Sequence, residues 1–152
     1  MNYRIVPMDK GHLKAVHRLE VANFSAPWSM AMLETELYND LASYLVAEGE
    51  DGTVLGYAGV HVVLDEGHIT NVCVGETFRR RGVGRELLKV YLRYGDAHLA
   101  TLDLEVRQSN EAAVKLYEGL GFEIAGRRPN YYTEPSEDGY IMRKLWDRGT
   151  EA

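Results

Sequence analysis

The fold is decided by the strand-like run Ile69-Thr70-Asn71-Val72-Cys73-Val74 and by Phe78-Arg79-Arg80-Arg81-Gly82-Val83-Gly84-Arg85-Glu86-Leu87-Leu88, which follows it closely. The first run is β-branched and apolar, and the second opens a segment with helical period. A glycine-rich turn between a strand and a helix presents backbone N–H groups that have no intrahelical partner. The helix dipole and nearby arginines favour an anion in front of them. The stretch therefore predicts a phosphate-binding turn between a strand and a helix.

Length and composition describe one globular domain with a continuous core. The chain has 152 residues, of which 45% are hydrophobic and 26% charged, close to globular averages. A single cysteine, Cys73, excludes a disulfide framework and fits a reducing compartment. No run approaches a signal peptide or the roughly 20 apolar residues of a membrane span. We expect a cytoplasmic protein without a membrane partner, with one domain over residues 1–147 and a short tail at 148–152.

The charge distribution favours binding of a small anionic ligand over binding of a nucleic acid. The formal net charge is −6, which argues against general nucleic-acid binding. Four of the 17 Lys and Arg residues nevertheless lie between Arg79 and Arg85. A local basic cluster on an acidic chain suits a small polyanion.

Periodicity and turn residues predict the element order βααβββαβαββ in a mixed α/β, three-layer fold. Asp9 and Ser29 are candidate N-caps for the first two helices, and residues 49–52 form a hairpin turn. The expected strands are 2–6, 43–48, 53–64, 68–74, 101–106, 122–127 and 139–146, and the later helices end near residues 97 and 120.

Three nucleotide motifs compete for the glycine turn. A P-loop requires Gly-Lys-Ser/Thr, whereas Arg85 and Glu86 stand there, so that motif fails. The dinucleotide fingerprint requires a third glycine where Leu87 stands, and hairpins precede the turn instead of a βαβ unit. The third pattern, Arg/Gln-x-x-Gly-x-Gly/Ala opening a helix, is matched by residues 79–84. The alternative interpretation is that residues 79–84 bind no ligand and simply begin a helix, with the arginines in solvent.

That third pattern resembles the pyrophosphate loop of the GNAT family of N-acetyltransferases. Later motifs agree in order and spacing, so the resemblance extends from about residue 3 to residue 146. They are Pro27-Trp28-Ser29, the run 104–113, Leu116-Tyr117-Glu118 with Gly121-Phe122, Asn130-Tyr131-Tyr132 and Glu137-Asp138. The resemblance is greatest to the branch that acetylates protein N-termini.

The resemblance implies a mostly antiparallel sheet with one splayed pair of strands. It implies acetyl-CoA as cosubstrate, no metal, and direct attack by the α-amino group of a protein N-terminus, with ribosomal protein S18 the first candidate. Acetylation of a lysine or a small amine such as a polyamine or antibiotic, and a non-catalytic CoA sensor, remain alternatives.

By the same resemblance, Glu105 is the general base and Tyr117 the acid that protonates the coenzyme thiolate. We expect the apolar strand around Glu105 to raise its pKa. A salt-bridged Glu105, with Arg107 as partner, and a Tyr117 that is ordinary core are the alternatives. Asp103 lies on the same strand face as Glu105 and is either a second relay carboxylate or a surface residue.

The resemblance also implies which residues hold the two substrates. The backbone of strand 71–74 donates to the thioester carbonyl, and Cys73 is a core residue, not a nucleophile. Asn110 caps a helix, contacts the coenzyme, or does both. The expected cofactor-binding residues are Val72, Cys73, Val74, Arg79, Arg80, Arg81, Gly82, Val83, Gly84, Arg85, Asn110 and Tyr117.

The acceptor side is expected at two loops. The expected substrate-binding residues are Phe24, Pro27, Trp28, Tyr131, Tyr132 and Glu134, although Tyr131 and Tyr132 can also simply form the end of the last hairpin. An α-amino group, with a pKa of about 7.7–8.0, is neutral far more often at pH 7 than lysine at about 10.4, so a modest base suffices for an N-terminus. The histidine spacings predict no metal site.

Overall fold

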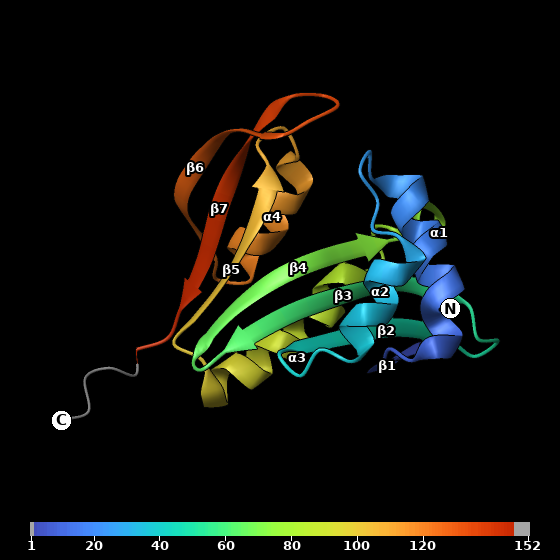
Figure 1. The fold of residues 1–152 in the computed structure, drawn as a ribbon. Coiled ribbons are helices and arrows are strands. Elements are labelled where there is room, and N and C mark those ends of the chain that lie inside the picture. The colour runs from blue at the N-terminus through green and yellow to red at the C-terminus, as the bar shows by residue number, and fades with distance from the viewer. Residues whose placement is uncertain (1, 148–152) are drawn as a thin grey trace. The chain divides into compact units, whose positions relative to one another are not determined.

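The structure, a computed structural model, describes residues 2–147, and the predicted tail at 148–152 lies outside them. Within residues 2–147, seven strands and four α-helices follow one another in the predicted order (Figure 1). The strands are β1 (Tyr3–Pro7), β2 (Ala42–Gly49), β3 (Val54–Val63), β4 (Glu66–Val74), β5 (Thr101–Arg107), β6 (Glu123–Tyr132) and β7 (Glu137–Leu145). The helices are α1 (Leu13–Asn23), α2 (Met30–Leu37), α3 (Val83–His98) and α4 (Glu111–Gly119), with short 3₁₀ turns before α1 and α3.

The strand order is β1-β2-β3-β4-β5-β7-β6. The ladders of β1 with β2, β2 with β3, β5 with β7 and β6 with β7 are antiparallel. A parallel ladder joins β4 to β5 over Glu66–His68 and Thr101–Asp103. The predicted mixed α/β class and the mostly antiparallel sheet are confirmed.

One predicted boundary is wrong. The last strand but one, expected to end at residue 127, continues to Tyr132. Pro129 and Asn130 are turn-forming residues, but here they accompany a register shift between Arg128 and Tyr132, and Tyr132 pairs with Glu137. A bulge keeps the strand going where composition predicts a turn.

The chain divides into two compact units. Among the described residues, 2–61 with 70–92 form unit 1 and 62–69 with 93–147 form unit 2. β4 and α3 each contribute residues to both. A single catalytic domain over 1–147 stays a prediction. Within residues 2–147, no helix is both long enough and apolar enough to cross a membrane.

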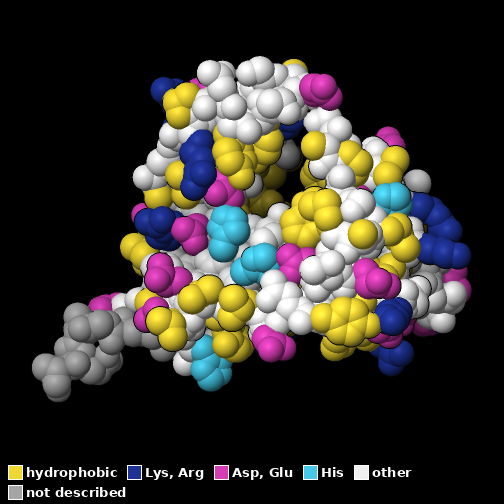
Figure 2. Space-filling view, viewed as in Figure 1, with side chains coloured by type: hydrophobic (Ala, Val, Ile, Leu, Met, Phe, Trp, Pro, Cys, Tyr) yellow, Lys and Arg dark blue, Asp and Glu magenta, His cyan; other side chains and the backbone are white. Residues whose placement is uncertain are grey.

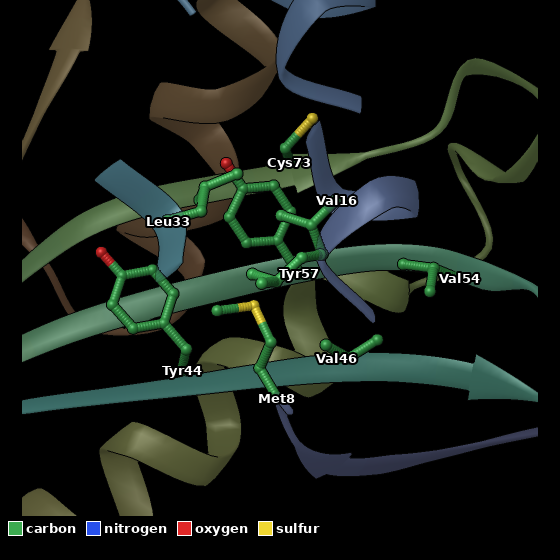
Figure 3. Close-up of a cluster of buried hydrophobic side chains, with 9 residues drawn as sticks. Met8, Val16, Leu33, Tyr44, Val46, Val54, Tyr57 and Cys73 are labelled. Carbon is green, nitrogen blue, oxygen red and sulfur yellow. The ribbon is translucent and has the colours of Figure 1, made fainter. Parts of the chain in front are cut away.

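In unit 1, helices cover both faces of the strands. α1 and α2 lie on one face of β1–β4 and the first part of α3 lies on the other (Figure 1). The Tyr91 hydroxyl of α3 donates to the carbonyls of Ser43, at 2.9 Å, and Ala58, at 3.0 Å. Nine buried side chains form a core cluster under α1 and α2 (Figure 3). They are Met8, Leu13, Val16, Leu33, Tyr44, Val46, Val54, Tyr57 and Cys73.

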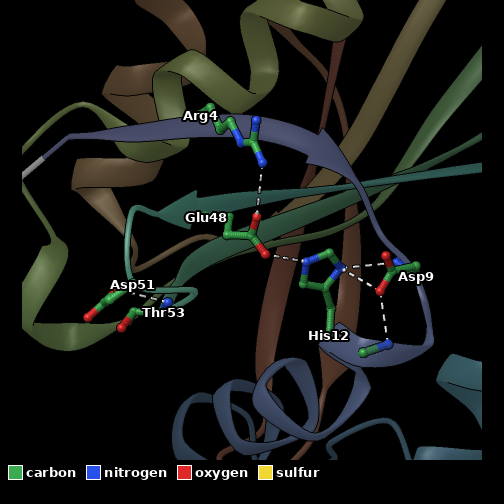
Figure 4. Close-up of polar contacts among 7 residues, drawn as sticks. Arg4, Asp9, His12, Glu48, Asp51 and Thr53 are labelled. Atoms are coloured by element: carbon green, nitrogen blue, oxygen red, sulfur yellow. Dashed lines mark hydrogen bonds and ion pairs between the residues drawn. The ribbon is translucent and has the colours of Figure 1, made fainter.

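A polar cluster fixes the start of α1 (Figure 4). The Asp9 carboxylate accepts from the Gly11 N–H at 2.8 Å, and the His12 ring accepts from the Asp9 N–H at 3.0 Å. The other ring nitrogen of His12 lies 2.8 Å from a Glu48 carboxylate oxygen on β2. This capping box confirms Asp9 as an N-cap, at the 3₁₀ turn that leads into α1.

In unit 2, β5 separates apolar from charged side chains by alternation. Leu102, Leu104 and Val106 are buried, while Asp103 and Glu105 lie on the opposite face. The expectation that Asp103 and Glu105 share one face is confirmed.

A close approach between β3 and β4 gives the first testable prediction. A Cβ on Gly56 would lie 2.7 Å from the Cys73 carbonyl oxygen. We expect Gly56→Ala to lower the free energy of unfolding by about 1–3 kcal/mol, because backbone must move. Urea denaturation measures the change. Gly119→Ala, where a Cβ meets nothing within 4 Å, is the control, and an equal loss in both variants would contradict the packing argument.

Candidate active site

The predicted phosphate turn in unit 1 contains two residues with positive φ. Arg80 has φ 64° and Gly82 has φ 79°, a left-handed conformation that glycine adopts without strain. The first intrahelical bond of α3 runs from the Glu86 N–H to the Gly82 carbonyl at 3.0 Å. The N–H groups of residues 83–85 therefore precede the helical ladder and are available to an anion.

The four arginines of the turn do not share one role. Arg79 donates through Nε to the Val74 carbonyl at 3.1 Å, and its Nη2 donates to the Asn23 side chain. These contacts tie the turn to β4 and α1. The side chains of Arg80, Arg81 and Arg85 are exposed. They are the better candidates for phosphate contact, while Arg79 holds the turn in place.

Cys73 on β4 is a core residue, as predicted. Its side chain is buried, and burial, with Glu20 nearby, raises the pKa of its thiol to about 12. A thiol with that pKa stays protonated near neutral pH and is a poor nucleophile. Its neighbours Val72 and Val74 are half-buried. The role of the β4 backbone toward a thioester carbonyl stays a prediction.

A buried carboxyl group anchors the predicted acceptor loop after α1. Glu20 is 1% exposed, and its side chain accepts from the Trp28 backbone N–H at 2.7 Å and from the Tyr57 hydroxyl. The Asn71 amide donates to the same carboxyl group at 3.5 Å. Trp28 is half-buried with its ring 6.4 Å from that of Tyr44, whereas Phe24 and Pro27 are exposed. The loop is therefore held at Trp28 and open at Phe24 and Pro27.

In unit 2, Glu105 lies in a charged cluster over β4, β5 and β6. Its side chain is 11% exposed, with Oε2 3.1 Å from Nε2 of His68 and Oε1 3.7 Å from Nη2 of Arg128. Asp103 accepts from Arg143 at 3.0 Å. The face shown in Figure 2 carries histidine, acidic and basic side chains gathered over these strands.

The expected pKa shift of Glu105 is wrong in direction. A hydrogen bond from His68 is the main cause of a lowered pKa; burial opposes it, and the positive charges of His68 and Arg128 add to it. The alternative of a salt-bridged Glu105 named Arg107 as partner, but Arg107 pairs with Glu137 at 3.2 Å, and the ion-pair partners of Glu105 are His68 and Arg128. An apolar strand sequence shows the burial of Glu105 but not the cations beside it.

The same pair raises the pKa of His68. The hydrogen bond to Glu105 is the largest cause, and the charges of Glu105 and Asp103 add to it. The pair therefore stabilises the fold fully between the ordinary pKa values of a glutamate and a histidine. This stabilisation is lost as pH falls through the lowered Glu105 pKa or rises through the raised His68 pKa.

Tyr117 is buried on α4, and its ring packs edge-on against Phe122 at a centroid distance of 6.0 Å. Burial raises the pKa of its hydroxyl to about 12. A group with that pKa is protonated near neutral pH, as a proton donor must be. Asn110 is the N-cap of α4, its Oδ1 accepting from the Ala113 N–H at 3.2 Å. The predicted cap is confirmed, and a coenzyme contact stays a prediction.

The last hairpin presents the remaining predicted residues. Tyr131 and Tyr132 pack edge-to-face at 5.0 Å, beneath the guanidinium groups of Arg128 and Arg107 respectively. Both tyrosines belong to the end of β6, so the hairpin interpretation is confirmed and a peptide contact stays a prediction. Glu134 is exposed with φ 53°.

His12, His61 and His68 each lie beside a carboxylate. His61 lies 2.9 Å from Glu36, just as His68 lies beside Glu105. Residues 2–147 contain no group of three or more His, Cys, Asp or Glu side chains that could hold a metal ion.

Comparison with known proteins decides the family. Residues 13–122 match the model of the acetyltransferase (GNAT) family. The chain belongs to this family. It is 37% identical over 142 residues to the [ribosomal protein bS18]-alanine N-acetyltransferase of Escherichia coli K12, covering 91% of this chain and 94% of the relative. The Salmonella typhimurium enzyme of the same name is 39% identical over 134 residues, covering 86% and 88%.

Two solved structures of acetyltransferases have a fold similar to that of this chain. The crystal structure of the ribosomal-protein-S18-alanine N-acetyltransferase from E. coli matches with a TM-score of 0.88 and 31% identity, covering 99% of each chain. Ard1 from Thermoplasma volcanium matches with a TM-score of 0.83 and 25% identity, covering 95% of this chain and 98% of that one. The predicted family and fold are confirmed.

Two groups of this GNAT chain escaped sequence reasoning. Histidine spacing in the sequence bears only on metal binding, whereas the parallel register pairs His68 with Asp103, two residues from Glu105. Glu20 stands one turn after Val16 on the apolar stripe of α1, a place that marks a buried carboxyl group. A carboxyl group on a core-facing stripe is the signal that would have found it.

Glu20 gives a testable prediction. Glu20→Ala removes the acceptor of the Tyr57 hydroxyl and of the Trp28 N–H. We expect unfolding free energy to fall by at least about 2 kcal/mol, because buried donors lose their partner, as measured by urea denaturation. Glu34→Ala, on the exposed face of α2, is the control and should change stability by about 0.5 kcal/mol or less. Similar losses in both variants would show that the Glu20 contacts contribute little.

Proposed function

We propose that the protein transfers acetyl from acetyl-CoA to the α-amino group of a protein N-terminus, with the N-terminal alanine of ribosomal protein bS18 the first candidate. The observation that carries the proposal is a pair of groups in unit 2, of which one is deprotonated and the other protonated near neutral pH. Glu105 has a lowered pKa and is an acceptor, while buried Tyr117 has a pKa near 12 and is a donor. Amine acetylation needs both.

The strength of Glu105 as a base bears on which amine is attacked. Its pKa lies below the ordinary value for a glutamate. An α-ammonium group lies more than about 3 pKa units above such a base, and a lysine more than about 6. Deprotonation of a lysine is therefore about 2.5 pKa units less favourable than that of a protein N-terminus, and this difference favours the N-terminus. The relatives named above are [ribosomal protein bS18]-alanine N-acetyltransferases, which supports a protein substrate.

Acetyl-CoA is the donor in this proposal, and the unit 1 turn binds its pyrophosphate. The N–H groups of residues 83–85 and the exposed side chains of Arg80 and Arg81 would supply donors and positive charge. Arg79 holds the turn in place through its hydrogen bonds to Val74 and Asn23. Bound there, the coenzyme supplies the activated acetyl thioester. Val72, Val74 and Asn110 are proposed as further contacts.

Each unit carries its own candidates for contact with an acceptor peptide. In unit 1 they are Phe24, Pro27 and Trp28, and in unit 2 they are Tyr131, Tyr132 and Glu134. Aromatic surface suits a small apolar first side chain. The exposed carboxylate of Glu134 suits a basic residue further along a ribosomal protein tail.

A peptide assay tests the acceptor. We expect rapid transfer from acetyl-CoA to a hexapeptide that begins Ala-Arg, measured by release of free thiol and by the mass of the product. The same peptide with a blocked N-terminus is the control and should not react. Turnover with spermidine or an internal lysine but not with the free N-terminus would replace the proposal by small-amine or lysine acetylation. Binding of coenzyme without turnover would indicate a sensor.

The phosphate turn gives a separate prediction. Replacing Arg80 and Arg81 together by Ala should raise the KM for acetyl-CoA about tenfold or more, because charge-assisted bonds to phosphate are lost. The kcat should change little, and the KM for the peptide should stay the same. Arg93→Ala removes one exposed arginine on the later part of α3 and is the control for loss of a surface arginine. Unchanged KM for acetyl-CoA in the double variant would remove these arginines from the binding site.

A further inference from the structure

We propose that His68 carries the amine's proton from Glu105 to solvent, so that Glu105 and His68 act together as a two-step proton relay. The inference rests on the proposed function, because it assigns a route to the proton that acetyl transfer releases. All of the groups that it uses belong to unit 2.

The balance of the reaction requires such a route. An α-ammonium group attached to its chain carries three N–H protons, and the amide product carries one. As the C–N bond forms and the C–S bond breaks, the leaving thiolate takes up one proton to become CoA thiol. The other proton must reach water. One net proton is therefore released in every turnover, and Glu105 can hold it only briefly.

The geometry provides the second step. Nε2 of His68 lies 3.1 Å from Oε2 of Glu105, within hydrogen-bonding reach for direct transfer. Glu105 is 11% exposed, whereas the His68 side chain is 44% exposed. The proton leaves the ammonium N–H for a Glu105 oxygen, and then moves from that oxygen to Nε2 of a neutral His68. The resulting imidazolium releases a proton to water through its exposed ring.

The surrounding charges suit this task. Glu105 and Asp103 on β5 face His68 and raise its pKa, while Arg128 on β6 and partial burial lower it, with a net rise. Arg143 on β7 pairs with Asp103 at 3.0 Å. A histidine above its ordinary pKa of about 6.5 lies closer to an α-ammonium at about 8 than a glutamate does. Proton transfer is most efficient between groups of similar pKa.

The relay has a defined pH dependence. The competent form has ionised Glu105 and neutral His68. Because the His68 pKa is raised, the competent form appears as pH rises through a value above that of an ordinary histidine. The kcat at saturating substrates should therefore climb through that pKa and then level off.

His68 acts through Glu105 and so is a positioning residue for the transferred proton. His68→Gln retains an amide that can donate to Glu105 but cannot carry a proton, whereas His68→Ala removes both properties. We expect kcat of both variants to fall at least about tenfold at pH 8, with each KM within about twofold of wild type. The rise of kcat with pH that we attribute to His68 should be absent from the kcat profiles of both variants over roughly pH 5.5–9.5.

A matched control exists in the same chain. His61 lies 2.9 Å from Glu36 and its side chain is 33% exposed, so His61→Gln breaks a similar pair that the proposal leaves without a role. Its kcat profile should equal that of the wild type. For His68→Ala, added imidazole and methylimidazoles should restore kcat, with the rate increasing with the pKa of the buffer base.

Several results would overturn the relay. They are a wild-type kcat profile in His68→Gln, a loss that His61→Gln shares, or a His68→Ala variant that no buffer base restores. NMR titration of the His68 ring gives a readout without substrate, because Glu105→Gln should lower its pKa; an unchanged value would show that the pair does not form. A wild-type protein that acetylates no N-terminal peptide would overturn the proposed function instead, which the peptide assay detects separately.

Discussion

The period-two alternation of β5 is the constraint on which the chemistry of unit 2 depends. Leu102, Leu104 and Val106 bury their side chains, so Asp103 and Glu105 must lie together on the other face. A slip of one residue would exchange the two sets and bury the carboxylates without partners. The parallel ladder then sets His68 of β4 opposite Asp103. The packing of three apolar side chains thus fixes which ionisable groups meet.

Much of this arrangement could be predicted from the sequence because it depends on local periodicity. The alternation around Glu105, the cap at Asn110 and the turn between a strand and a helix at the phosphate motif are all local properties, and all are confirmed. The end of β6 was missed because Pro129 and Asn130 favour a turn locally, while pairing of Tyr132 with Glu137 is a non-local effect.

The electrostatics of the site could not be predicted in the same way. A carboxyl group in an apolar strand is expected to have a raised pKa, since burial disfavours its charged form. Burial does oppose ionisation of Glu105, but His68 and Arg128 approach it from other strands and outweigh that effect. The sign of a pKa shift depends on the nearest charges, which are set by strand register. Likewise, Arg79 belongs to the motif by sequence, but its contacts to Val74 and Asn23 give it a supporting position.

A carboxylate held ionised by cations is a weak base, and this weakness bears on selectivity. Each pKa unit between acceptor and base is a tenfold penalty on the proton transferred. The penalty for a lysine exceeds that for an α-amine by about 2.5 pKa units with any base weaker than both amines, and Glu105 is such a base. A weak base with a histidine behind it keeps the penalty small only for amines that lose a proton near neutral pH. Selectivity for N-termini can therefore arise in part from the proton path, in addition to any contact with the peptide chain.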